Sequence, residues 1–536
     1  MVTLLPGFTP GNYTSLEQSW SMALKWLQDC LKNHTHCTKA ADSTRRPTRL
    51  LDIGSNHLDR IRVVDTTHED ISGPYVTLSH CWGKIKPLRL LRSNLNQFMT
   101  EIAWQDLPLT FQHAISFTRY LKVRYLWIDS LCIIQDFDWL DDWYREVSLM
   151  QEVYQGSFLN LAADFAVDST KGLFPDSLPR QIPIVHLPAS TTPQAEYIRH
   201  VIWYVYLWDW EVEWSPLAAR SWYVQERVLA PRILHFGKSQ LFWECHEKRA
   251  AERHIVKEFA KLCEGCSRER GDEVLIKNFD WSGITKKDIL EVIWPRIVYT
   301  FSKTDMSNPE DKLIALAGVS RNLGTIAGCR YLAGLWEESL VIQLCWQAML
   351  APEGLLPRPS TYRAPSFSWA SVDAIVEWPD DKEYKTFAEV VEISTSPITT
   401  DMYGAVNDGY MILKSLLKSL SLTPEKNGKG FRVEIPGISI RPWPTAYMDS
   451  SGIEVKPGDI FFVFFLLVKT KWSDVFEGLV IQPTGTRGTF RRVGIVTMRE
   501  VKPDLHQDLI KPVSDASTLP CISYDEASGK HTIRIV

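Results

Sequence analysis

The sequence has little of what marks membrane, secreted or nucleic-acid-binding proteins. Its strongest apolar run, residues 460–468, is about half as long as a membrane helix must be, and its aromatic and β-branched content favours a buried strand. The N-terminus lacks the basic and apolar regions of a signal peptide, so we expect a cytoplasmic protein. The net charge of −5 argues against a broad basic surface for nucleic acid.

Common catalytic and metal-binding motifs are also missing. The chain has no glycine-rich phosphate loop, no GxSxG, no HExxH and no kinase signature. Its ten cysteines are scattered, so we expect mostly free, buried thiols. The candidate metal ligands are Cys30, His34, His36 and Cys37 in one segment and Cys263 and Cys266 in another. The first segment matches no standard zinc-finger spacing and the second is a single CxxC pair, so we predict a helix end in the first and no metal site.

The chain is too long for one core, and its composition changes along its length. From 536 residues we expect roughly two to four domains. Tryptophan is frequent, with 21 copies, which indicates well-packed interior surfaces. Proline-rich residues 166–195 predict an irregular excursion. The expected parts are a helical and extended lead-in at 1–74, an α/β core at 75–250, a helix-rich extension at 251–370 and a mostly β domain at 371–536.

Alternating strands and helices after residue 74 predict an α/β fold with an open, mostly parallel sheet. The expected elements are a strand at 75–79, a helix at 108–121, an apolar strand at 125–134, a helix at 138–158, and a helix with two short strands around Gly237. Open α/β sheets usually bind ligands at the carboxyl ends of their strands. Residues 129–136, where the apolar strand releases polar side chains, are therefore the first place to expect chemistry.

Four reactive side chains follow the first two predicted strands. His80 and Cys81 come after one strand, and Asp129 and Cys132 come at the end of the other. If these strands are neighbours, the four side chains supply a thiol nucleophile, a base and an orienting acid. The alternative is that both cysteines are small buried residues and that Asp129 caps a turn.

Glu146, on the helix after the apolar strand, is a further catalytic candidate. It lies near Asp142 and Arg145 in the sequence. A carboxylate at this position could act as a base or stabilise an oxocarbenium ion during glycosidic cleavage. The alternative is an ordinary glutamate on a solvated helix face.

Glu226 is the third acidic candidate, on a predicted helix that also carries Trp222 and Gln225. Trp222 and Glu226 share one helix face because they are four residues apart. A buried Glu226 needs a partner such as Arg220 or Arg232, or its pKa is raised. A structural ion pair and a functional acid both stay open.

Taken together, five segments resemble the fungal heterokaryon incompatibility (HET) domain. They are YVTLSHCWG at 75–83, LPLTFQHAI at 107–115, YLWIDSLCIIQD at 125–136, WYREVSLMQEVY at 143–154 and RSWYVQERVLAPRILHFGKSQLFWEC at 220–245. The resemblance implies a sheet related to Toll/interleukin-receptor domains and a role in nonself recognition that ends in programmed cell death. Within these motifs we expect ligand-binding or structural roles for Trp82, Gly83, Gln135, Arg220, Trp222, Gln225 and Arg232.

The resemblance leaves two other functions open. Some Toll-receptor-like domains cleave NAD with a glutamate on the helix after a strand end, and Glu146 matches that position. NAD is therefore a candidate substrate. We expect no other cofactor with certainty. Some HET-like genes lie beside genes for metabolite biosynthesis, so the resemblance is also compatible with a small-molecule enzyme or an accessory protein of secondary metabolism. A third alternative is a module without catalysis that binds other proteins through its tryptophans. We expect a protein partner or small-molecule ligand, with self-association open, and neither nucleic acid nor a membrane span.

Overall fold

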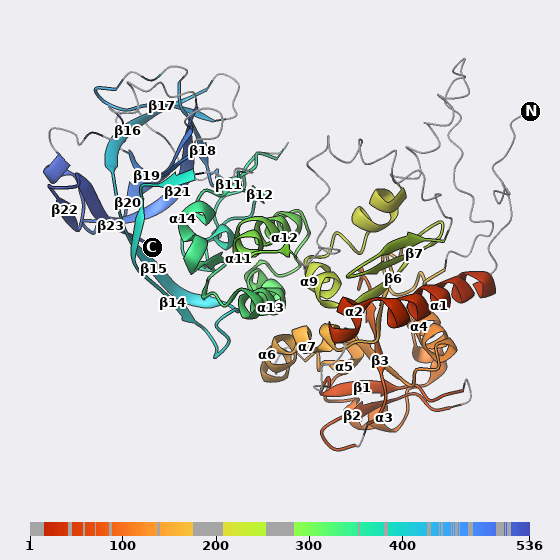
Figure 1. Cartoon of the computed structure of the whole chain (residues 1–536). Helices are drawn as coiled ribbons and strands as arrows, with labels where there is room; N and C mark the ends of the chain where they lie inside the picture. Colours follow the sequence, from red (N-terminus) through yellow and green to blue (C-terminus); the bar gives the residue numbers. More distant parts are fainter. Residues whose placement is uncertain are drawn as a thin grey trace, which may run out of the picture. The chain divides into compact units, whose positions relative to one another are not determined.

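The computed structural model shows two compact units, residues Met1–Ser282 and Gly283–Val536 (Figure 1). The structure describes residues 16–40, 46–174, 207–252 and 283–536, with short gaps at 57–58, 70, 85–87, 137–139, 352–353, 380–383, 426–429, 439, 441–442, 452, 454, 456–458, 460, 470–474, 500–508, 510 and 512–515. Most of the proline-rich excursion, residues 175–195, and the CxxC pair lie outside the described residues.

The first unit is built on an eight-stranded sheet with the order β2-β1-β4-β3-β5-β6-β7-β8. Its strands are β1 (Arg49–Asp52), β2 (Arg62–Asp65), β3 (Tyr75–Ser79), β4 (Tyr125–Ile128), β5 (Leu159–Ala162), β6 (Arg232–Phe236), β7 (Leu241–Cys245) and β8 (Arg249–Ala251). The four central strands, β4, β3, β5 and β6, are parallel. The strands on both sides of them are antiparallel. The predicted parallel sheet is confirmed for this centre, and the predicted hairpin around Gly237 is confirmed as β6 and β7.

Helices connect the parallel strands of this sheet. They are α3 (Leu95–Thr100), α4 (Leu109–Tyr120), α5 (Asp129–Cys132), α6 (Leu140–Ser148), α7 (Met150–Gln155) and α9 (Ser221–Leu229). The predicted helix at 108–121 is confirmed as α4, which buries Phe111, Ala114, Ile115 and Phe117 at helical spacing.

Two predictions in this region were wrong in detail. The strand expected at 125–134 ends at Ile128, because the Asp129 side chain accepts the Ser130 N–H and the Asp129 carbonyl accepts the Ile133 N–H, which starts the short helix α5. The helix expected at 138–158 is divided into α6 and α7 at Leu149. There the Leu149 N–H bonds to the Glu146 carbonyl only three residues back.

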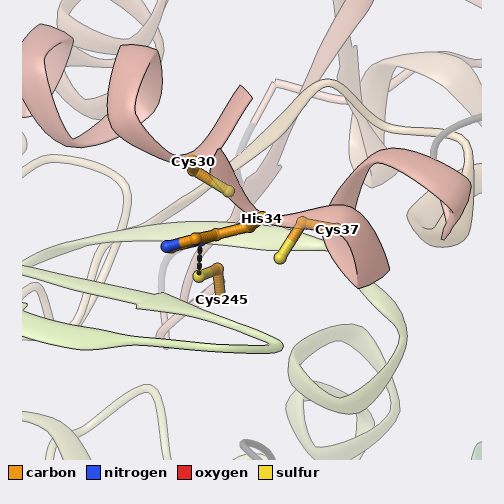
Figure 2. Close-up of side chains that lie close together, drawn as sticks. All are labelled: Cys30, His34, Cys37 and Cys245. Carbon is orange, nitrogen blue, oxygen red and sulfur yellow. Dashed lines mark hydrogen bonds between the residues drawn. The ribbon is translucent and has the colours of Figure 1, made fainter. Parts of the chain in front are cut away.

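The N-terminal segment belongs to the same unit as the α/β core. Strands β1 and β2 extend the sheet beyond β4. The helical part of the expected lead-in consists of α1 (Leu16–Asn33), followed directly by α2 (Thr35–Ala40). The α1 helix packs on β7, with the rings of Trp26 and Trp243 6.5 Å apart. Figure 2 shows the ends of these elements, where residues of α1 and α2 meet the end of β7.

The second unit contains short helices and an eleven-stranded sheet. The helices are α11 (Lys286–Asp288), α12 (Trp294–Ser302), α13 (Ala317–Ala327) and α14 (Leu340–Gln343), and the strands of the large sheet are β13 (Tyr384–Thr386), β14 (Glu389–Pro397), β15 (Val406–Ser415), β16 (Leu417–Pro424), β17 (Phe431–Glu434), β18 (Thr445–Met448), β19 (Phe461–Lys469), β20 (Val475–Pro483), β21 (Thr489–Met498), β22 (Ser523–Asp525) and β23 (Lys530–Ile535). Six of these strands, β16 to β21, pair in a closed ring.

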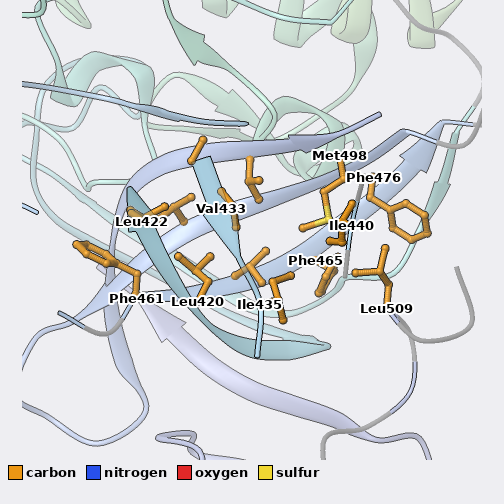
Figure 3. Packing of buried hydrophobic residues seen from close by; sticks show 14 of the residues in the cluster. Leu420, Leu422, Val433, Ile435, Ile440, Phe461, Phe465, Phe476, Met498 and Leu509 are labelled. Carbon is orange, nitrogen blue, oxygen red and sulfur yellow. The ribbon is translucent and has the colours of Figure 1, made fainter. Parts of the chain in front are cut away.

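A hydrophobic core fills this ring of strands (Figure 3). Leu420, Val433, Phe465 and Phe476 are among its buried members. Residues 461–468 of the apolar run lie in β19, so the prediction of a strand there is confirmed. Among the residues that the structure describes, no helix is long and apolar enough to cross a membrane.

Candidate functional site

The ends of the parallel strands β3 and β4 bring two predicted site residues together. The two strands run in register with Leu78 opposite Ile128, so the residues that follow them share one edge of the sheet. The Nδ1 atom of His80 lies 3.8 Å from Oδ1 of Asp129. The indole Nε1 of Trp82 donates a hydrogen bond of 2.8 Å to the other carboxylate oxygen, Oδ2. His80, Trp82 and Asp129 thus form the first half of a strand-end cluster.

His80 is the most deeply buried residue of this cluster. Its side chain is 1% exposed, and neither ring nitrogen has a hydrogen-bond partner among the described residues. Its ring meets the edge of Phe111 at a centroid distance of 5.0 Å. Burial lowers the pKa of His80 to about 4, although Asp129 opposes the shift and Arg220 adds to it. The imidazole is therefore neutral at physiological pH, with two buried nitrogens that can still bind a ligand or a water molecule.

Arg220 and Glu226 complete the strand-end cluster from the side of α9. The Arg220 guanidinium donates to the backbone carbonyl of His80. Burial opposes its charge, but Glu226 and Asp129 outweigh burial and raise the pKa of Arg220. Glu226 is buried, and burial raises its pKa despite the attraction of Arg220. Its Oε2 has no hydrogen-bond partner among the described residues. A guanidinium beside a buried acid whose pKa is raised can hold an anionic group.

Only some members of the cluster are exposed to solvent. The Asp129 carboxylate is 19% exposed, and Trp82 and Arg220 are partly exposed, whereas His80 and Glu226 are buried behind them. A ligand that reaches Asp129 and Arg220 would therefore come close to the unpaired atoms of the two buried side chains.

The two predicted cysteine nucleophiles are poorly placed for that role. Burial raises the pKa of Cys81 to about 11 and that of Cys132 to about 12. Both thiols are therefore protonated at neutral pH, and the thiolate is the nucleophilic form. The geometry supports the alternative interpretation of Cys81 and Cys132 as buried structural residues.

Glu146 lies in a separate ionic cluster around Arg49 of β1. The Arg49 guanidinium donates to Asp142 at 2.5 Å and lies 3.8 Å from Glu146, and its Nε donates to the Cys132 carbonyl. Arg145 contacts Glu146 at 3.2 Å. Glu146 is only 2% exposed, so it is not the solvated glutamate of the alternative interpretation. Burial raises its pKa, and Arg49 opposes the shift.

The remaining motif residues have partners that fix the local backbone. The Gln135 side-chain amide donates to the carbonyls of Asp129 and Ile133, and Gly83 has a left-handed φ of 71°. The ring of Trp222 packs on that of Trp143 at 6.2 Å, and the Gln225 amide contacts the Met150 sulfur at 4.0 Å. Arg232 is buried and donates to the carbonyls of Phe158 and Cys37. These contacts support structural roles.

Sequence reasoning missed a second buried network next to the cluster. Asp164 follows β5, and its carboxylate lies 3.0 Å from the Nδ1 atom of His235 on β6. The Nε2 atom of His235 lies 3.5 Å from Glu244, which pairs with Arg227 at 2.7 Å. The sequence did not indicate this network, because Asp164 is 71 positions from His235. The useful signal was the charged residues inside the apolar segments RILHF and LFWEC, since such charges need partners.

A group of four potential metal ligands lies elsewhere in the first unit. Cys30, His34 and Cys37 from the N-terminal helices meet Cys245 at the end of β7 (Figure 2). The donor atoms all lie within 4.8 Å of one another. His36, which the sequence offered as a ligand, is exposed and is not part of this group. The predicted helix end is confirmed, but the side chains around it can hold a metal ion.

Comparison with known families matches residues 75–226 to the family described as heterokaryon incompatibility protein (HET). Searches of curated proteins and of solved structures gave no significant match. The matched residues contain β3, β4, β5 and most of α9, and with them the whole strand-end cluster. The resemblance seen in the sequence is thereby confirmed for residues 75–226, the part of this chain that matches the HET family.

Proposed function

We propose that this chain acts in fungal nonself recognition and regulated cell death, with the HET domain as the part that produces the response. The observation that carries the proposal is that the HET match covers the complete strand-end cluster of His80, Trp82, Asp129, Arg220 and Glu226. Buried polar atoms without partners lower stability, so a fold that keeps several at one edge of a sheet keeps them for a role other than stability.

Expression of the whole chain from an inducible promoter in a fungal host tests this proposal. Growth arrest and loss of viability after induction are the expected result. The matched control is Leu126→Asp, because Leu126 is fully buried in β4 and a charge there disrupts the HET sheet. Harmless expression of the wild-type chain at high abundance would contradict the proposal.

A second candidate function, cleavage of NAD, rests on Glu146. A buried carboxyl whose pKa is raised, at the end of a sheet and beside Arg49, has the features of a group adapted for acid or base chemistry. Two further predictions rest on the resemblance alone. They are a fold related to Toll/interleukin-receptor domains and a role in secondary metabolism.

Nicotinamide release from NAD by the purified chain tests this candidate. Release that Glu146→Gln abolishes and Glu101→Gln preserves would support it, because Glu101 is an exposed glutamate of the same unit. If the wild-type chain releases no nicotinamide, NAD cleavage is contradicted. The cell-death response would then depend on ligand binding at the strand-end cluster.

A further inference from the structure

The four side chains Cys30, His34, Cys37 and Cys245 have the composition of a structural zinc site. Three thiols and one imidazole are a common ligand set for tetrahedral Zn²⁺. Ideal Zn–S bonds place the donor atoms of a tetrahedron about 3.8 Å apart. Here all donor atoms lie within 4.8 Å of one another, and the Nδ1 atom of His34 lies 3.3 Å from the Cys245 sulfur. A small inward movement is enough to close the site on an ion.

The backbone around these residues explains how they meet. Cys30 lies in the last turn of α1, His34 lies between the helices, and Cys37 is on α2. The His34 N–H bonds to the Cys30 carbonyl, which holds the break between the helices in place. Figure 2 shows the side chains of the three residues directed toward Cys245 at the end of β7.

Neighbouring contacts hold this arrangement from the outside. Arg232 of β6 donates a hydrogen bond of 3.0 Å to the Cys37 carbonyl, and Asp29 pairs with Lys248 at 2.7 Å next to Cys245. The His36 N–H donates to Glu247. The bond from Arg232 joins Cys37 to β6, and the bonds of Asp29 and His36 join the N-terminal helices to the β7–β8 turn, as outer contacts do at metal sites.

We propose that Cys30, His34, Cys37 and Cys245 bind one Zn²⁺ ion, which fastens the N-terminal helices to the end of β7. The ion joins residues that are 211 positions apart in the sequence. Its role is structural, because all four positions are occupied by protein ligands and none is left for a substrate. The site lies outside residues 75–226, so this proposal is independent of the function proposed for the HET domain.

Elemental analysis and cobalt substitution of the full chain test the proposal. The protein purified from zinc-supplemented cells should contain about one zinc ion per chain. After chelation, added Co²⁺ should give the ligand-field bands of a tetrahedral site and a sulfur-to-cobalt charge-transfer band. Wild-type protein that binds neither ion, or that carries a disulfide between two of these cysteines after purification under reducing conditions, would overturn the proposal.

Variants separate this site from the other cysteines and histidines of the chain. Cys245→Ala should remove the bound metal, and because that variant could fail to fold, His34→Cys provides a second measurement. His34→Cys should keep the metal and strengthen the charge-transfer band, since a fourth sulfur replaces nitrogen. The controls are His36→Ala and the double variant Cys263→Ser with Cys266→Ser, both of which should keep the wild-type metal content and spectrum. Loss of metal in either control, with retention in Cys245→Ala, would overturn the assignment of these ligands.

Discussion

His80 and Asp129 face each other across two neighbouring parallel strands, with 3.8 Å between Nδ1 of the imidazole and Oδ1 of the carboxylate. This distance is too long for a direct hydrogen bond. Both imidazole nitrogens of His80 are therefore without hydrogen-bond partners among the described residues. The His80 side chain is buried, whereas that of Asp129 is partly exposed to solvent. The role proposed for the strand-end cluster depends on this arrangement.

The first prediction concerns the stability of the fold at acid pH. The pKa of folded His80 is about 4, below the ordinary value of about 6.5, so between these values the unfolded chain binds a proton that the native chain does not. The contribution of His80 to the free energy of unfolding therefore falls by about 2 kcal/mol from about pH 7 to about pH 5. Denaturant unfolding at both pH values should show this loss in the wild type and not in His80→Gln. Equal losses in both proteins would show that His80 is not buried in its neutral form.

The second prediction concerns the buried network around Glu244. This side chain is fully buried and pairs with Arg227 and Arg249, both at 2.7 Å. Glu244→Ala leaves buried positive charge without its partner and should lower the free energy of unfolding by about 3 to 5 kcal/mol. Glu69→Ala, which breaks a partly exposed pair with Arg62, should cost less than about 1 kcal/mol. Similar losses in the two variants would contradict the burial of the network.

The third prediction concerns Gly83 in the HET segment that follows β3. A Cβ atom at Gly83 would lie 2.4 Å from the Cβ of Asp168, and φ is +71°. Gly83→Ala should therefore lower stability by about 1 to 3 kcal/mol more than Gly73→Ala. Gly73 also has a positive φ, but nothing lies within 4 Å of its added Cβ. Thermal unfolding of the two variants measures the difference, and equal midpoints would refute the close contact with Asp168.

The fourth prediction concerns Arg492 in the second unit. Its guanidinium is fully buried and donates to Asp449 and to the carbonyls of Leu344 and Trp346. Lysine keeps the charge but cannot reach these acceptors at once, so Arg492→Lys should lower the free energy of unfolding by about 2 to 4 kcal/mol. Arg330→Lys, at an exposed pair with Glu337, should have almost no effect. An unfolding curve for Arg492→Lys that overlays the wild type would contradict this contact pattern.

Strong local patterns made much of the fold predictable from the sequence. The apolar run YVTLS at 75–79 and the short segments RILHF and LFWEC on either side of Gly237 identified β3, β6 and β7. The polar residues after 79 and 128 correctly identified the edge of the sheet where His80 and Asp129 meet. Strands β1 and β2 were expected only as part of an extended lead-in, because segments of four residues, RLLD and RVVD, are too short for a periodic signal.

Contacts between distant parts of the sequence were not predictable in the same way. The sequence offered His36 as the fourth ligand beside Cys30, His34 and Cys37, whereas the fourth donor in the structure is Cys245, which lies 211 positions from His34. The pKa of Glu146 also depends on a residue that is distant in the sequence, because Arg49 of β1 opposes the effect of burial on it. Local spacing carries no information about partners of this kind.

The most direct test of the account is viability after induced expression of Asp129→Asn in a fungal host. This substitution keeps the size of the side chain but removes the carboxylate that faces His80 and balances Arg220. At equal protein abundance and with a native-like circular dichroism spectrum, Asp129→Asn should be harmless where the wild type and Glu101→Gln stop growth. A folded Asp129→Asn chain that kills as efficiently as the wild type would contradict the assignment of function to the strand-end cluster.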